Sequence, residues 1–151
     1  MREGVKFSLA YLAGFFDGEG SVGIYSNGQV TGHGLKIQIT QNDSTYTREL
    51  FEHLRATYGG RFDTQRTLSG NLKLNFQLNG DNASEFLRGI VSLLRFKKKQ
   101  AMFAMEWALT RPRRIRGAKG RYLPRSIDAL VKDRRASLTM KRLKRESFVK
   151  G

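Results

Sequence analysis

Two carboxylates stand between glycines at the end of an apolar stretch, in the sequence LAGFFDGEG at residues 12–20. The apolar spacing predicts a helix that Gly18 and Gly20 bring to an end, so Asp17 and Glu19 fall at its C-terminus. A helix C-terminus carries partial negative charge, which disfavours each carboxylate there by about 0.3–1 kcal/mol. A bound cation would reverse the local field. Because two carboxylates stand where the helix dipole disfavours them, this helix end is a candidate metal site.

The same helix carries small residues at a spacing of four, namely Ala10, Gly14 and Gly18, with Ala13 beside them. Such a stripe lets a second backbone approach closely, as small residues do between membrane helices. A two-fold symmetric pair formed through this stripe would bring two copies of Glu19 to the axis. Two carboxylates a few ångströms apart are suited to metal ions that hydrolyse phosphodiesters.

The chain has 151 residues and a formal charge of +15 that is unevenly distributed. Residues 1–110 hold 13 Lys and Arg against 10 Asp and Glu, whereas residues 111–151 hold 15 against 3. This distribution predicts a polyanionic partner, nucleic acid above all, although a ribosomal-type structural protein or a solvated basic tail would also be basic. The absence of Cys excludes disulfides and thiolate metal sites.

Hydrophobic periodicity and turn residues predict the order of the elements. They are a helix over about 9–18 capped by Ser8, strands over 21–25 and 33–41, a helix from caps at 42–44 to about 58, strands over 61–66 and 71–79, a helix from a capping box at 82–85 to about 94, a helix over 98–110, and a last helix over about 125–145. We expect an α+β fold, in which two hairpins form a four-stranded antiparallel sheet with helices on one face.

Two parts are expected, a core domain over residues 1–110 and a basic C-terminal extension over residues 111–151. In the last helix, five apolar residues fall near one stripe: Ile127, Leu130, Val131, Leu138 and Leu143. We therefore expect the extension to pack on the core and to add phosphate contacts, the alternative being a disordered basic tail. No apolar run approaches the ~18 residues of a membrane span and no signal peptide is visible, so we expect an intracellular protein, cytoplasmic or organellar and not secreted.

The strand faces that point away from the helices are predicted to be polar. They carry Gln, Asn, Lys and Arg, the side chains that read base edges, rather than the Glu and Lys mixture of an ordinary solvated face. The residues are Ser21, Gly23, Tyr25, Lys36, Gln38, Thr40, Arg61, Asp63, Gln65, Lys73, Asn75 and Gln77. This face is a candidate DNA-binding surface, and plain solvation of an exposed strand face is the alternative.

LAGFFDGEG resembles the LAGLIDADG motif of homing endonucleases. It matches that motif at Leu12, Ala13, Gly14, Asp17 and Gly20, with Glu19 at the second acidic position. The order of elements over roughly residues 7–110 also fits the αββαββα fold of that family, whose four-stranded sheet is saddle-shaped. Glu in place of Asp at the second acidic position is a departure from the motif, and its side chain is one methylene longer.

The resemblance implies roles for particular residues. Glu19 would coordinate divalent metal ions together with the backbone carbonyl of Gly18, while Asp17 would accept structural hydrogen bonds near the helix end. Gln41 would hold a water molecule, and Lys97 would polarise water or stabilise the charge that develops on phosphorus. Lys98 and Lys99 follow directly, so which of the three lysines is catalytic stays open, and the other two would contact DNA, as would Arg66.

The resemblance further implies a site-specific, Mg²⁺-dependent and intron-encoded homing endonuclease, in which Mn²⁺ substitutes and Ca²⁺ binds without supporting cleavage. One motif copy implies a homodimer, with its interface at Ala10, Ala13, Gly14, Asp17 and Gly18 and a near-palindromic DNA target. Strands of about ten residues at ~3.3 Å each follow roughly nine base pairs per half-site. The alternatives are an intron maturase that binds RNA and a DNA-binding protein of this fold that has lost cleavage.

Overall fold

The computed structural model describes residues 6–26, 32–111, 116–121 and 123–149. Its elements are α1 (Leu9–Glu19), β1 (Gly20–Ser26), β2 (His33–Asn42), α2 (Thr45–Tyr58), β3 (Arg61–Arg66), β4 (Leu72–Asn79), α3 (Gly80–Ile90), the 3₁₀ turn η1 (Val91–Leu93), α4 (Lys98–Thr110) and α5 (Ile127–Val149). The four strands form one antiparallel sheet in the order β1-β2-β4-β3. The predicted α+β fold is confirmed.

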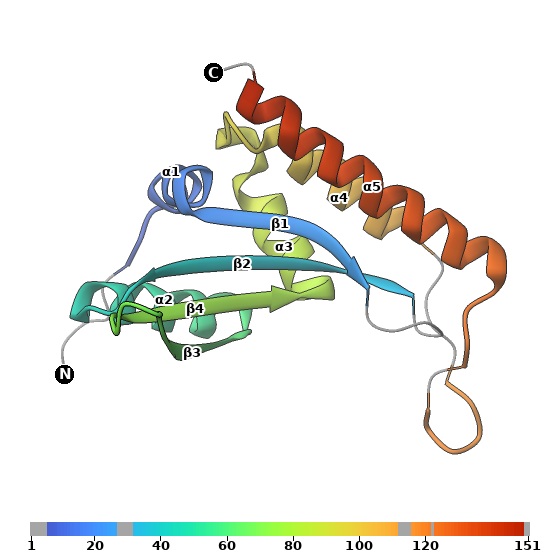
Figure 1. The fold of residues 1–151 in the computed structure, drawn as a ribbon, viewed down its shortest axis with the longest axis horizontal. Helices are drawn as coiled ribbons and strands as arrows, with labels where there is room; N and C mark the ends of the chain where they lie inside the picture. The colour runs from blue at the N-terminus through green and yellow to red at the C-terminus, as the bar shows by residue number, and fades with distance from the viewer. Residues whose placement is uncertain (1–5, 27–31, 112–115, 122, 150–151) are drawn as a thin grey trace.

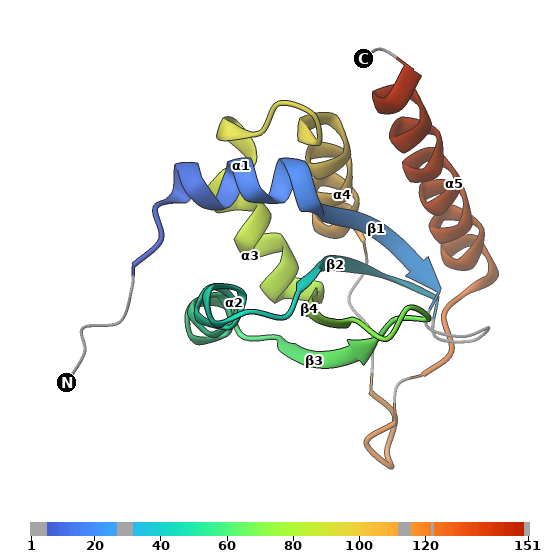
Figure 2. The ribbon, with the colours of Figure 1, turned by 60° about the vertical axis from the view of Figure 1, so that its left-hand side comes forward.

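The core lies between the sheet and the helices on one of its faces (Figures 1 and 2). Alternation in β2 turns Leu35, Ile37 and Ile39 toward the helices, and all three are buried. Phe16 of α1 and Phe86 of α3 meet edge to face there, with ring centroids 5.5 Å apart. The period-two pattern of the strands therefore fixes which face of the sheet is covered and which stays open.

The start of α3 differs from the prediction. This helix begins at Gly80, directly after β4, and Asn79 makes no side-chain cap, so the expected capping box at residues 82–85 is wrong. Gly80 has a φ of +56°, which glycine tolerates and which lets the chain pass from strand to helix without a loop. None of the helices in the described parts of the chain is long and apolar enough to cross a membrane.

The C-terminal helix α5 runs along β1, the edge strand of the sheet, and also contacts α4 (Figures 1 and 2). Its buried residues are Asp133, Ala136 and Met140. Three of the five residues predicted to face the core are exposed instead: Ile127, Val131 and Leu138. The other two, Leu130 and Leu143, are partly buried. The prediction is therefore wrong for three residues, because the docking face centres on a charged residue, which a hydrophobic pattern assigns to solvent.

Asp133 ties α5 to the rest of the chain. Its Oδ2 accepts the backbone N–H of His33 at 3.0 Å and pairs with the Arg111 guanidinium at 2.8 Å. The Asp133 side chain is 3% exposed and that of Arg111 is 14% exposed, so little solvent screens the pair. The guanidinium of Arg111 also lies 4.6 Å from the ring centroid of Trp107, at the end of α4. One carboxylate thus joins α5, β2 and the end of α4.

We expect Asp133→Ala to lower the free energy of unfolding by about 3 kcal/mol, because it removes a buried carboxylate that pairs with the Arg111 guanidinium and accepts the backbone N–H of His33. Urea denaturation followed by circular dichroism measures this. Glu146→Ala is the control on the same helix, since its exposed 3.8 Å pair with Arg142 contributes about 0–1 kcal/mol. Equal losses in the two variants would show that Asp133 does not fasten the helix.

Candidate functional site

Asp17 joins the end of α1 to the segment that precedes α4. Its carboxylate accepts the backbone N–H groups of Arg95 at 2.7 Å and of Lys97 at 3.0 Å. The Lys97 ammonium in turn donates to the backbone carbonyl of Asp17. These three hydrogen bonds fix the position of Lys97 at the C-terminus of α1, next to the second acid of the motif. Asp17 is therefore occupied with holding the backbone.

Lys97 is half-buried at this helix end. Desolvation by burial lowers the pKa of its ammonium, the nearby charges of Asp17 and Glu19 raise it, and Lys144 of α5 lowers it again, with a net lowering. Lys98 and Lys99 lie in the first turn of α4 and are exposed. Of the three consecutive lysines, Lys97 alone has a hydrogen bond to the end of α1 among the described residues.

Glu19 and Gly18 are exposed in the last turn of α1. The carbonyls of a last turn lack intrahelical partners, so one carboxylate and one carbonyl can offer oxygen ligands here. Oxygen donors of this kind fit Mg²⁺ and Ca²⁺. Within the parts of the chain that the structure describes, no group of three or more His, Cys, Asp or Glu residues gathers to hold a metal ion.

Gln41 lies near the α1–β1 junction, because Ile39 pairs with Gly20 and Gln41 is two residues further along β2. It shares the helix-facing side of the strand with Ile37 and Ile39 rather than the open polar face. Its Oε1 accepts the backbone N–H of Asn42 at 3.1 Å. This leaves its amide NH₂ as a donor beside the end of α1.

The strand register brings the predicted polar residues to one face. Ser21 pairs with Gln38, Gln38 with Gln77, and Gln77 with Arg61, so this row crosses all four strands. Gly23 and Asn75 are buried members of this set, and the Oδ1 of Asn75 accepts the hydroxyl of Thr40 at 3.2 Å. The open face therefore carries a continuous row of amide, hydroxyl and basic side chains.

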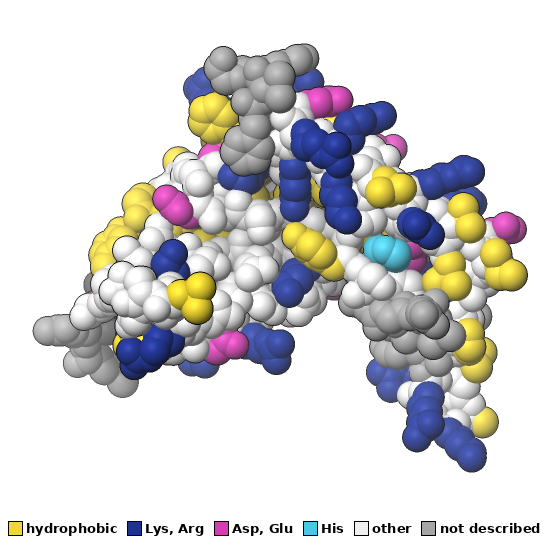
Figure 3. Space-filling model, in the orientation of Figure 1, with side chains coloured by type: hydrophobic (Ala, Val, Ile, Leu, Met, Phe, Trp, Pro, Cys, Tyr) yellow, Lys and Arg dark blue, Asp and Glu magenta, His cyan; other side chains and the backbone are white. Residues whose placement is uncertain are grey.

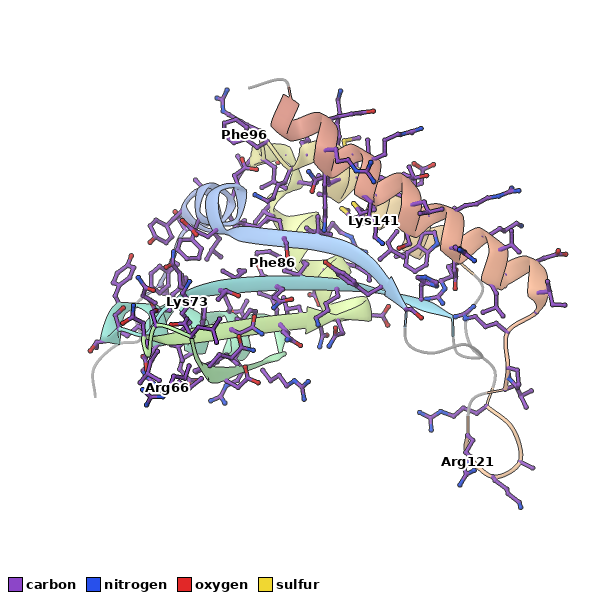
Figure 4. All side chains as sticks on the ribbon, in the orientation of Figure 1. Arg66, Lys73, Phe86, Phe96, Arg121 and Lys141 are labelled. Carbon is purple, nitrogen blue, oxygen red and sulfur yellow. The ribbon has the colours of Figure 1, made fainter. Side chains whose placement is uncertain are left out.

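Arg66 does not share this face. Along β3, Asp63 and Gln65 point to the open face, whereas Arg66 points to the opposite face. The Nη1 of Arg66 donates to the carbonyl of Gly70 in the turn after β3. Arg66 and Lys73 project from the same end of the sheet (Figure 4). The expected DNA contact of Arg66 therefore lies outside the open face.

The small-residue stripe of α1 is narrower than predicted. Ala10, Gly14 and Gly18 are exposed, and a Cβ placed on Gly14 or Gly18 would meet no atom within 4 Å. Ala13, in contrast, is 1% exposed and belongs to the core of its own chain. Ala13 lies 100° around the helix axis from Gly14, and the rest of its own chain covers it. It therefore has no surface to contribute to an interface. Asp17 is partly buried and engaged with Arg95 and Lys97.

The chain has the fold of the LAGLIDADG homing endonucleases. No family model matches the sequence, and no curated protein matches it either. The homing endonuclease I-CvuI, solved with its DNA target and Ca²⁺, superimposes with a TM-score of 0.65 at 18% identity, over 89% of this chain and 80% of that one. The homing endonuclease I-TnaI gives 0.56 at 14% identity, over 97% and 99%. LAGLIDADG homing endonuclease I-GzeII, solved with a DNA target, gives 0.55 at 13%, over 95% of this chain and 45% of that one.

We expect Asp17→Ala to lower the free energy of unfolding by about 2 kcal/mol, because two backbone N–H groups lose a charged acceptor. Thermal and urea denaturation measure the loss. Asp81→Ala is the control, since Asp81 is an exposed acid in the first turn of α3 and contributes about 0.3–1 kcal/mol through the helix dipole. If Asp17→Ala cost no more than the control, the bonds to Arg95 and Lys97 would be unimportant for stability.

Lys144 is a neighbour of this site that the sequence did not reveal. It lies 119 residues from Tyr25 in the chain, yet its Nζ is 3.4 Å from the Tyr25 hydroxyl. It stands in a run of basic residues on α5, and such a run does not say which of its members faces inward. The contact depends on the way α5 packs along β1.

Proposed function

We propose that the chain is a site-specific DNA endonuclease that acts as a homodimer and hydrolyses one phosphodiester on each strand with divalent metal ions. One observation carries the proposal: Asp17 fixes the Lys97 ammonium at the helix end where Glu19 is exposed. An ammonium group and a carboxylate that can bind a metal ion, placed at the same helix end, suit phosphodiester hydrolysis. The fold is shared with endonucleases solved on DNA.

Glu19 and the Gly18 carbonyl would hold the metal ion in each copy. When bound, Mg²⁺ supplies charge stabilisation for the phosphate and lowers the pKa of attacking water. Lys97 would stabilise negative charge on the non-bridging oxygens, and it is a better candidate than Lys98 or Lys99 because only its side chain reaches the end of α1 among the described residues. Gln41 would orient a water molecule with its amide NH₂. Mn²⁺ would substitute, and Ca²⁺ would support binding alone.

The homodimer is proposed because of the number of metal-binding carboxylates in one chain. One chain brings one such carboxylate, and the exposed stripe at Ala10, Gly14 and Gly18 permits a second helix to approach. This chain aligns with 45% of I-GzeII, as expected if that longer chain holds about two units of this size. A two-fold dimer implies a near-palindromic target with two half-sites.

The open sheet face would read the target. The row from Ser21 across Gln38 and Gln77 to Arg61 offers donors and acceptors to base edges in the major groove. Lys98 and Lys99 would contact phosphates beside the active site. The exposed Glu19 favours cleavage over the two alternatives, a cleavage-inactive DNA-binding protein and an intron maturase that binds RNA.

A supercoiled plasmid library with random inserts tests the proposal. We expect Mg²⁺ to yield linear products whose sequenced ends define a near-palindrome, and Ca²⁺ to yield bound but uncut DNA. Cleavage without sequence preference would contradict site specificity. A folded protein that binds duplex DNA and never cuts the library would contradict the endonuclease activity itself.

A further inference from the structure

Tyr25 lies flat on the open face of the sheet instead of standing away from it. A Cβ on Gly23 would come within 2.4 Å of the Tyr25 ring and within 2.7 Å of its hydroxyl oxygen, so the ring covers Gly23 on the same strand. Only a glycine leaves this space. The ring therefore forms a platform on β1, with its hydroxyl pointing back along the strand in the direction of Gly23.

Two ammonium groups meet at this platform from different elements. Lys144 of α5 places its Nζ 5.5 Å from the ring centroid and 3.4 Å from the hydroxyl oxygen. Lys36 of β2, the strand partner of Gly23, places its Nζ 5.8 Å from the same centroid. Figure 3 shows that Lys and Arg side chains gather where α5 passes over β1.

Neither ammonium has an acidic partner in the described part of the chain. The ion pairs found there involve other residues. The positive charge of Lys144 also lowers the pKa of Lys97, the lysine at the end of α1. Two ammonium groups beside one ring without an acidic partner repel each other, and an anion between them would relieve that repulsion.

We infer that Lys144, Tyr25 and Lys36 form a binding site for a backbone phosphate of duplex DNA, which positions the strand against the end of α1; this inference rests on the function proposed above. The two ammonium groups donate to the non-bridging oxygens. The Tyr25 hydroxyl accepts from Lys144 and keeps its own proton to donate to the phosphate. The C-terminal helix thereby contributes a positioning residue to the active centre.

Binding and cleavage by Lys144→Gln are compared with those by Arg142→Gln, which removes one charge from a side chain 70% exposed on the same helix. Fluorescence anisotropy with random-sequence duplex in Ca²⁺, at about 50 to 200 mM salt, should show affinity about tenfold lower for Lys144→Gln. The slope of the logarithm of the association constant against the logarithm of the salt concentration should become shallower by about 0.9, as for one lost phosphate contact. Arg142→Gln should change affinity less than about twofold.

Three further variants separate the phosphate site from a loss of folding. Lys144→Arg should restore affinity because it keeps the charge, while Tyr25→Phe and Gly23→Ala should weaken binding by about threefold, through loss of the hydroxyl and displacement of the ring. On the target selected from the library, Lys144→Gln should also lower the single-turnover rate at saturating protein by about tenfold, which a purely structural role would leave unchanged.

The outcomes distinguish this inference from the proposed function. A wild type that cleaves, with Lys144→Gln no weaker than Arg142→Gln, overturns the phosphate site and leaves the endonuclease intact. A wild type that binds without cleaving, with Lys144→Gln weakened and Lys144→Arg restored, supports the phosphate site and overturns the endonuclease. A folded wild type that does not bind duplex DNA overturns both.

Discussion

Glu19→Gln should abolish cleavage while DNA binding is retained. Glutamine keeps the size and the exposed position of the side chain but removes the negative charge that a divalent ion needs. The loss of metal-derived stabilisation of the transition state amounts to several kcal/mol, so the single-turnover rate in Mg²⁺ should fall by roughly a thousandfold or more. Affinity for uncut DNA should stay within a few-fold, because the open sheet face is unchanged.

Quenched-flow cleavage and anisotropy on the selected target measure the two effects. Glu49→Gln is the matched control, since Glu49 is an exposed glutamate on α2, remote in the chain from the end of α1. It should cleave at the wild-type rate. Full activity of Glu19→Gln would remove Glu19 from the metal site and with it the main support for the proposed mechanism.

The sheet could be predicted from the sequence because its information is local. In β2 the alternation of Leu35, Ile37 and Ile39 with polar residues sets both the strand and its covered face, and the observed register follows from it. The cap at Ser8 also works as predicted, since its hydroxyl oxygen accepts the backbone N–H of Tyr11. The predicted start of α3 was wrong, because the positive φ of Gly80, rather than a capping side chain, begins that helix.

The packing of distant segments could not be predicted. Asp17 contacts Arg95 and Lys97 across 78 and 80 residues, and no periodicity encodes such a meeting. The docking face of α5 centres on Asp133, a buried acid whose partner lies on another segment. Ala13 shows the same limit on a smaller scale, because a small residue in a helix packs equally well in a core or in an interface.

Gly14→Leu should convert the proposed homodimer to a monomer without weakening the fold of the chain. Gly14 is exposed, and a Cβ there meets no atom of its own chain within 4 Å, so the leucine has space in the isolated subunit. Leucine also favours the helix over glycine by up to about 1 kcal/mol. Thermal stability of the subunit should therefore be equal or higher, which separates this variant from an ordinary destabilising change.

In the dimer the same leucine would stand where the second α1 approaches, and its bulk would force the two helices apart. Sedimentation equilibrium should give the mass of one chain. Ala56→Leu, a similar enlargement at an exposed position of α2, should leave the dimer intact. Because one subunit brings one Glu19, the monomer should also lose double-strand cleavage. An unchanged dimer mass for Gly14→Leu would place the interface elsewhere, and the two copies of Glu19 would then have no reason to meet.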